Sequence, residues 1–130
     1  PPLHGMIILK LIAWNDRPED RDNDLKDILL IIKEYFDINS EEIFDEHFDT
    51  FPEEFDKIIV AARVLGRKTA VIITQSKKVK DRIIQVLDNN TSDVNKTPIA
   101  ERWARENNWT IEYAIKVLSQ IKLGITETID

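Results

Sequence analysis

The residues best suited to chemistry lie near the start of the chain. Lys10, Trp14 and Arg17 follow one another at intervals of four and three residues, so on a helix two cations and an aromatic ring share one face. Asp24 and Asp27 come after a short turn and would likewise share a face of the next helix. Because a lysine in an apolar run is rarely buried without a counter-charge, we expect these two aspartates to hold Lys10. A positioned lysine and arginine also favour binding of a nucleotide phosphate.

A purely structural interpretation fits the same residues. Lys10 at a helix flank can reach water along its apolar stem, and the segment 15–24 can form a charged, solvated turn. In that case the residues have no chemical role. The spacing alone leaves both interpretations open.

Metal binding receives little support from the sequence. The chain has no cysteine, and its histidines, His4 and His47, are far apart and lack the spacing of metal ligands. The alternating acids at 20–24 are similar to the opening of a calcium loop, but its sixth and twelfth positions hold Leu25 and Ile31 instead of Gly and Glu. We therefore expect no metal ligands in this chain.

The elements that must position these residues are predicted to be helices. Apolar residues recur at intervals of three and four through most of the chain. The segment 69–74 has strand propensity, but we expect helix there because an isolated strand would lack a pairing partner. The fold class is therefore predicted to be all-α, a multi-helix bundle of about six or seven helices. The expected helices span 6–14, 20 or 22 to 36, 40–48, 55–74 with a break or stop at Gly66, 76–87, 98–104 and 110–124.

Helix ends are indicated by polar caps and by glycines. Gly66 and Gly124 are expected to interrupt or end helices, because glycine adopts a left-handed cap conformation at low cost. Side-chain oxygens next to the first helical turn indicate N-caps. The expected N-caps are Asp20 or Asp22, Ser40, Ser76, Thr97 followed by Pro98 in the first turn, and Thr110.

The inner faces of the helices follow from the same periodicity. The second expected helix should bury one continuous apolar row, and Trp103 and Trp109 should act as core or lid anchors. In the short acidic helix the inward set is expected to be Ile43, Phe44 and Phe48, and Phe55 should begin the inner face of the next helix. The buried row of the second helix is Leu25, Ile28, Leu29, Ile32 and Phe36.

Length and composition indicate one helical domain, 1–130. The 130 residues are 42% hydrophobic and 32% charged, which excludes a disordered chain, and no apolar run approaches the ~20 residues that span a bilayer. The absence of cysteine favours a reducing compartment, so we expect a cytoplasmic protein. The polar segment 88–96 is the best candidate for an internal linker. Because Pro1 is neither an initiator Met nor the start of a signal peptide, we expect a processed product or a piece of a longer protein.

Charge is distributed unevenly along the chain. Residues 1–65 include 16 Asp or Glu against 7 Lys or Arg, whereas residues 66–130 include 8 against 11. The acids of 41–56 are typical of a solvated face, or they dock against a basic partner. In the second half, Arg67-Lys68 and the cations from Lys77 to Arg82 could contact the phosphates of an RNA such as tRNA.

The block around Lys10 resembles a known family. The string Leu-Lys-Leu-Ile-Ala-Trp-Asn-Asp-Arg at 9–17, followed by Asp-Leu-Lys-Asp-Ile at 24–28, is similar to the second sequence block of the nucleotidyltransferase-like proteins of the AbiEii/AbiGii toxin family. The fold of that family belongs to the DNA polymerase β-like superfamily. The resemblance covers about residues 6–36 of this chain. The later Leu-Gly-Arg at 65–67 is similar to a recurring element of related proteins.

The resemblance implies catalytic roles for Lys10, Asp24 and Asp27. In that family the lysine lies against the nucleotide triphosphate and the later aspartate supports the site. By the same likeness Arg17 gives charge support, and we expect it and Arg21 to bind phosphate beside Lys10.

The register of the acidic pair stays open. The family often has Arg or Lys directly before the first aspartate, whereas Asn23 precedes Asp24 here. Matching Arg21-Asp22 instead would put Leu25 where the second aspartate belongs.

Members of the family also resemble one another in an earlier block, Gly-Ser followed by Asp-x-Asp, which holds Mg²⁺ for phosphoryl transfer. This chain has no Gly-Ser, so Mg²⁺ is expected for the complete protein with ligands that are not in this chain. We therefore expect the C-terminal helical portion of a nucleotidyltransferase-like protein, of toxin-antitoxin type, that is inactive without its missing N-terminal half. Its expected partners are an NTP, that half, and either a tRNA acceptor or an antitoxin protein, with no membrane. The alternative is a non-catalytic, all-helical protein-interaction module whose acidic first half binds a basic partner.

Overall fold

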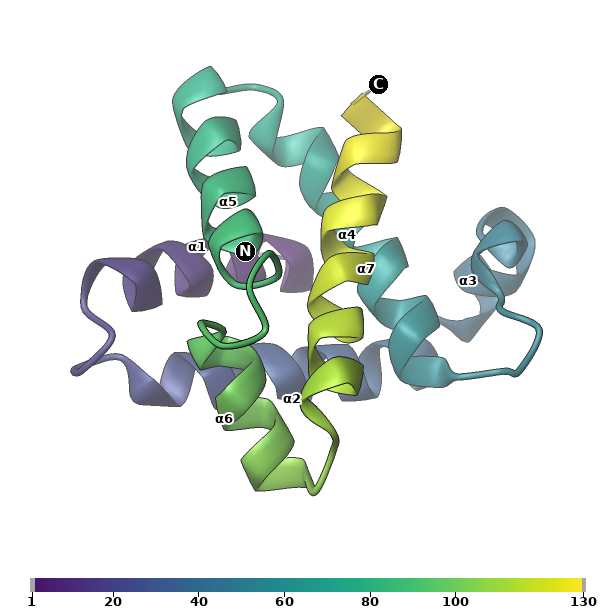
Figure 1. Ribbon diagram of the computed structural model, residues 1–130. Helices are drawn as coiled ribbons and strands as arrows, with labels where there is room; N and C mark the ends of the chain where they lie inside the picture. The colour runs from purple at the N-terminus through teal and green to yellow at the C-terminus, as the bar shows by residue number, and fades with distance from the viewer. Residues whose placement is uncertain (1, 130) are drawn as a thin grey trace.

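Two long helices cross at the centre of the molecule. Figure 1 shows α7 (Ile111–Ile129) passing across α4 (Lys57–Ile73), with the other helices arranged around this pair. The computed structural model describes residues 2–129. Over that range the chain forms seven α-helices, a short 3-10 helix η1 and no strand, which confirms the predicted all-α bundle. The remaining helices are α1 (Leu3–Asp16), α2 (Asp22–Ile38), α3 (Ser40–Glu46), η1 (Phe48–Thr50), α5 (Lys77–Asn89) and α6 (Pro98–Asn107).

The central crossing depends on two glycines that face each other. A Cβ on Gly124 would overlap the carbonyl oxygen of Arg63 and lie 2.9 Å from the backbone nitrogen of Arg67. A Cβ on Gly66 would overlap the carbonyl oxygen of Ile121 and lie 3.0 Å from the Cα of Gly124. The prediction that these glycines interrupt or end helices is therefore wrong, because both helices continue past them. Their small size lets the two backbones touch.

The apolar first helix forms one side of the core. Its buried residues are Ile7, Ile8, Leu11 and Trp14, and it packs against α2, α4 and α5. A helix enclosed by three neighbours needs apolar residues on most of its surface, which explains why its sequence shows little helical periodicity. The predicted helix at 6–14 is confirmed, and the helix predicted at 69–74 is confirmed as far as Ile73, where α4 ends.

The second helix buries the face that its periodicity predicts, since all five residues of the predicted row lie in the core. α6 closes over this face. The indole nitrogen Nε1 of Trp103 donates a hydrogen bond of 2.9 Å to the carbonyl oxygen of Leu25, so the predicted core role of Trp103 is confirmed. Trp109 is half-buried and meets Tyr113 edge to face with ring centroids 4.9 Å apart.

Helix capping agrees with the sequence at some ends and differs at others. Ser76 accepts a hydrogen bond from the backbone nitrogen of Val79, and Thr110 accepts one from that of Tyr113, as predicted. Ser40 is instead the first residue of α3, because the chain passes from α2 to α3 through a single non-helical residue. The starts of α2 and α6 have no side-chain cap, although Pro98 lies in the first turn as expected.

Three phenylalanines depart from their predicted positions. Phe44 and Phe48 are 52% and 63% exposed, and Phe55 is 50% exposed in the segment before α4. Only Ile43 of the predicted inward set of α3 lies in the core. A helix of seven residues has only about two turns to present to its neighbours, so it cannot bury every apolar side chain.

The segment predicted as a linker connects α5 to α6 and is fixed at both. The buried Asn90 donates from Nδ2 to the carbonyl oxygen of Val86 at 2.9 Å, and its Oδ1 accepts from the backbone nitrogen of Ile99 at 3.3 Å. Among residues 2–129, no helix has both the length and the apolar character needed to cross a membrane.

Candidate functional site

The hairpin of α1 and α2 brings Lys10 to the acidic pair. α1 packs lengthwise on α2, and Lys10 lies on the α1 surface that faces the start of α2. Its ammonium Nζ donates a hydrogen bond of 3.0 Å to Oδ2 of Asp27 and lies 3.6 Å from Oδ1 of Asp24. The ion-paired hairpin expected from the sequence is therefore present.

Asp24 is the buried member of this network. Its side chain is only 6% exposed, and Arg21 grips both of its oxygens, at 2.7 Å from Nε and 3.1 Å from Nη2. A bidentate guanidinium fixes the orientation of a carboxylate. The position of Asp24 next to Lys10 is thus set by a side chain three residues earlier.

Electrostatics keep Lys10 positively charged. The hydrogen bond to Asp27 raises the pKa of the Lys10 ammonium, against a smaller opposing effect of burial. The Lys10 side chain is 20% exposed and that of Asp27 is 47% exposed, so the network opens to solvent at Asp27. An ammonium has three donors, and a ligand on the open side can bind without displacing Asp24.

These contacts show which aspartates face Lys10. Asp24 and Asp27 are the aspartates that face Lys10, whereas Asp22 pairs with Arg102 of α6. The alternative register, with Asp22 as the first member of the pair, places that member on a different partner.

The other predicted site residues lie apart from this network. Arg17 is exposed and has a non-helical backbone conformation just beyond the end of α1, so it does not continue the helical face of Lys10. Trp14 is buried in the core. The cations and the aromatic ring that the spacing placed on one face therefore have three different environments.

A hollow of about 420 Å³ adjoins the network between α2 and α6. Asp27 contributes to its wall together with the cations Lys26 and Lys33, and the ring of Trp103 forms part of its floor. Glu106 of α6 also lines the hollow, so its wall combines two lysines with two carboxylates. Asp27 links this hollow to Lys10.

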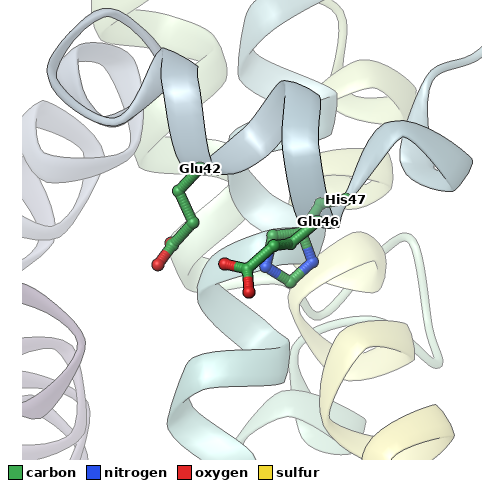
Figure 2. A group of neighbouring side chains, drawn as sticks. All are labelled: Glu42, Glu46 and His47. Atoms are coloured by element: carbon green, nitrogen blue, oxygen red, sulfur yellow. The ribbon is translucent and has the colours of Figure 1, made fainter.

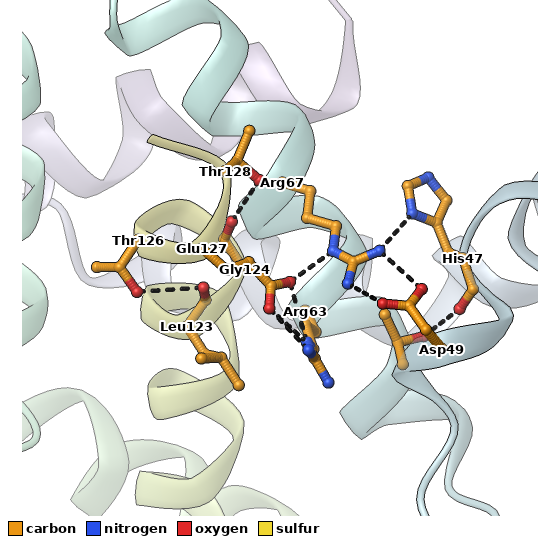
Figure 3. Close-up of polar contacts among 10 residues, drawn as sticks. His47, Asp49, Arg63, Arg67, Leu123, Gly124, Thr126, Glu127 and Thr128 are labelled. Atoms are coloured by element: carbon orange, nitrogen blue, oxygen red, sulfur yellow. Dashed lines mark hydrogen bonds and ion pairs between the residues drawn. The ribbon is translucent and has the colours of Figure 1, made fainter. Parts of the chain in front are cut away.

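A second polar network, which the sequence analysis missed, joins η1, α4 and α7. Figure 3 shows Arg67 between two carboxylates: its guanidinium contacts Asp49 at 2.6 Å and also binds Glu127. Arg63 binds Glu127 at 2.7 Å. These contacts hold the pKa of Glu127 below its ordinary value, chiefly through the hydrogen bond from Arg63. The spacing of Arg63 and Arg67 by one turn indicates a shared face, but their partners are distant in the sequence.

Glu42, Glu46 and His47 form the one group in residues 2–129 whose ligand atoms lie close enough for a metal ion. Figure 2 shows the three side chains converging below α3. Two of these side chains already bind cations, because Lys68 donates to Glu42 at 2.7 Å and Arg67 donates to Nδ1 of His47 at 3.0 Å. Burial, followed by the charge of Arg67, lowers the pKa of His47. The arrangement is suited to salt bridges more than to a metal.

These pairs also bear on the predicted RNA contact. Arg67 and Lys68 are neutralised by carboxylates of η1, α3 and α7, whereas Lys78 on α5 is exposed. Comparison of the chain with protein-family models, with curated proteins and with solved structures found no match.

Proposed function

We propose that this chain is the helical portion of a nucleotidyltransferase-like protein, in which Lys10 contacts the phosphates of a nucleoside triphosphate. One observation supports this most directly: Lys10 is held by Asp24 and Asp27 of the next helix. These are the residues that the resemblance of the 6–36 segment assigns to the nucleotide site.

The proposed roles follow from burial and charge. Lys10 neutralises phosphate charge, which is how a positioned cation promotes phosphoryl transfer. Asp27 orients the Lys10 ammonium from the open side, and Asp24, which Arg21 holds, orients it from beneath. Arg17, exposed at the end of α1, is available to a phosphate that approaches along the hairpin.

In the complete enzyme Mg²⁺ would supply charge neutralisation at the transferred phosphate. Asp24 does not fit as its ligand, because Arg21 and Lys10 already bind the carboxylate. The carboxylates that hold Mg²⁺ would therefore come from another segment, and we expect no nucleotidyl transfer by these 130 residues alone.

A nucleotide titration tests the proposal. ATP, GTP, CTP and UTP are added with Mg²⁺ while tryptophan fluorescence is followed, since Trp14 lies one turn from Lys10 and Trp103 lines the adjoining hollow. We expect weak binding of at least one nucleotide and its loss in Lys10→Ala. Lys78→Ala, which removes an exposed cation on α5, is the matched control and should bind as the native chain does.

The outcomes separate a specific site from general charge attraction. Equal binding by Lys10→Ala and the native chain removes the assigned role of Lys10. Equal loss in both variants indicates a diffuse electrostatic effect. Circular dichroism of each variant checks that the helices remain folded.

Within this proposal, an RNA acceptor would meet α5 in preference to Arg67 and Lys68. The carboxylates around those two side chains compete with phosphate. If tRNA is the acceptor, Lys78→Glu should weaken tRNA binding and lower its dependence on salt, whereas Lys68→Ala should change tRNA binding little. A gel-shift titration with unfractionated tRNA measures both.

A further inference from the structure

All five phenylalanines of the chain meet at the junction of α2, α3, η1 and the segment before α4. Phe36 is buried at the base. Phe44 packs on Phe36 with ring centroids 5.9 Å apart, and Phe51 lies 4.9 Å from Phe48 and 5.4 Å from Phe55. We name the surface formed by Phe44, Phe48, Phe51 and Phe55 the phenylalanine patch.

The patch faces solvent despite its size. Phe44, Phe48 and Phe55 are each at least half exposed. Single exposed apolar side chains are normal on a protein surface, but a contiguous group of aromatic rings is typical of an interaction site. Aromatic side chains are also the residues that most often dominate the binding free energy of an interface.

Exposed acids flank the patch on α3 and in the segment before Phe55, and we name them the acidic rim. Between Glu34 and Asp56 the sequence has no lysine or arginine. Glu41 and Asp45 are one turn apart on α3, the helix that carries Phe44, and both acids are exposed. Neither pairs with a cation among residues 2–129.

Two further acids and a hollow extend the rim. Glu53 and Glu54 are exposed immediately before Phe55. On the other side, a hollow of about 640 Å³ at the corner between α2 and α3 is lined by Glu41, Asp45 and Glu46 together with Ile38. Glu42 also lines this hollow but already pairs with Lys68, so a lysine or arginine side chain entering it would meet three other carboxylates and an apolar contact for its stem.

We propose that the phenylalanine patch binds a cationic amphipathic helix of a partner protein. Apolar side chains on one face of that helix would cover the rings, and its lysines or arginines would pair with the acidic rim. The chain already shows this kind of contact internally, since Nζ of Lys57 lies 5.9 Å from the centre of the Phe36 ring.

The proposed surface is separate from the Lys10 site. The hairpin network lies toward the start of α2, and the patch lies at and beyond its end, with α3 projecting at that side of the molecule in Figure 1. A test of the phenylalanine patch is therefore independent of a test of the Lys10 site.

The test uses a fluorescein-labelled synthetic helix of about 14 residues that presents leucines on one face and lysines on the other. Its binding to the full chain is measured by fluorescence anisotropy. A matched peptide with serine in place of leucine retains the charge without the apolar face. A second peptide, with glutamate in place of lysine, retains the apolar face with the opposite charge. We expect binding of the first peptide only, weakened by added salt.

Variants locate the binding surface. Phe48→Ser should weaken binding roughly tenfold or more. The control Leu9→Ser removes a side chain of similar exposure, 60% against 63%, and should bind as the native chain does. Glu53→Gln combined with Glu54→Gln should weaken binding, and the exposed Glu112→Gln on α7 should not.

Three results would overturn the proposal. The first is binding of the serine peptide as tightly as the leucine peptide, which would reduce the effect to charge. The second is equal binding by Phe48→Ser and Leu9→Ser. The third is a concentration-dependent dimer in sedimentation that Phe48→Ser abolishes, because the patch would then be covered by a second copy of the chain.

Discussion

Replacing Gly124 with alanine should separate the two central helices. The added Cβ would overlap the carbonyl oxygen of Arg63 and lie 2.9 Å from the backbone nitrogen of Arg67. Both are backbone atoms of α4, so no flexible side chain can move aside. Carbon and oxygen atoms approach ordinarily to about 3.3–3.6 Å, and the helices must therefore move apart by about 1 Å or more.

The size of the stability change follows from the packing that is lost when the two helices move apart. A gap of about 1 Å forfeits up to roughly half of the dispersion energy between facing atoms. Backbone displacement in a packed core costs about 1–3 kcal/mol, or more when several layers move. Alanine returns about 1 kcal/mol of helix propensity relative to glycine. Because the overlap is with backbone atoms, we take the upper end of the packing cost, and we expect Gly124→Ala to lower the free energy of unfolding by about 2 kcal/mol.

Urea unfolding followed by circular dichroism measures this change. Gly66→Ala should behave similarly, because its Cβ would overlap the carbonyl oxygen of Ile121. The double variant should lose less than the sum of the two, since helices already separated accept a second methyl group at lower cost. A neutral or stabilised Gly124→Ala would mean that helix propensity decides the outcome, and the close crossing would then be refuted.

Three other outcomes can be measured with the same unfolding assay. Asp24→Ala should lower the free energy of unfolding by roughly 1–3 kcal/mol, because it leaves Arg21 and Lys10 without their buried partner. Asp27→Ala changes a half-exposed side chain and should lower it by at most about 1 kcal/mol. Equal losses in the two variants would contradict the argument from burial. Glu127 has a lowered pKa in the folded state, so its contribution to stability is full above its ordinary pKa and is lost as pH falls through the folded value; Glu127→Gln should flatten stability across that acid range. Trp103→Phe removes the donor to the carbonyl oxygen of Leu25 and should cost about 1–3 kcal/mol, and a neutral effect would show that the indole nitrogen is not constrained there.

The sequence predicts the hairpin network because it is local. Lys10 and its aspartates lie on consecutive helices joined by a short turn, so helical spacing and the need for a counter-charge suffice to pair them. The Arg67 network cannot be predicted by the same reasoning. Its partners Asp49 and Glu127 are 18 and 60 residues away, and the α4 and α7 crossing that joins Arg67 to Glu127 depends on Gly66 and Gly124.

The errors at the glycines and phenylalanines have the same physical origin. A glycine within an apolar helix and a glycine at a helix end look alike in sequence, and only a second backbone at close range distinguishes them. Likewise, periodicity tells which side chains share a face and not whether anything covers that face. Phe44 of α3 and Phe48 of η1 have neighbouring rings, and no other helix of the described chain covers them completely.

The ion pairs around Lys10 are better explained by the fixed position that they give its ammonium group than by a contribution to stability. Buried ion pairs recover little more than the desolvation that they cost, and well-packed apolar residues often replace them without loss. α1 and α2 already share an apolar interface that includes Leu11, Leu25 and Ile28. What Arg21, Asp24 and Asp27 add is a fixed position and a permanent charge for one ammonium group that still reaches solvent. Contact with a phosphate requires such a group, and we therefore propose a functional role for Lys10 and a positioning role for the side chains around it.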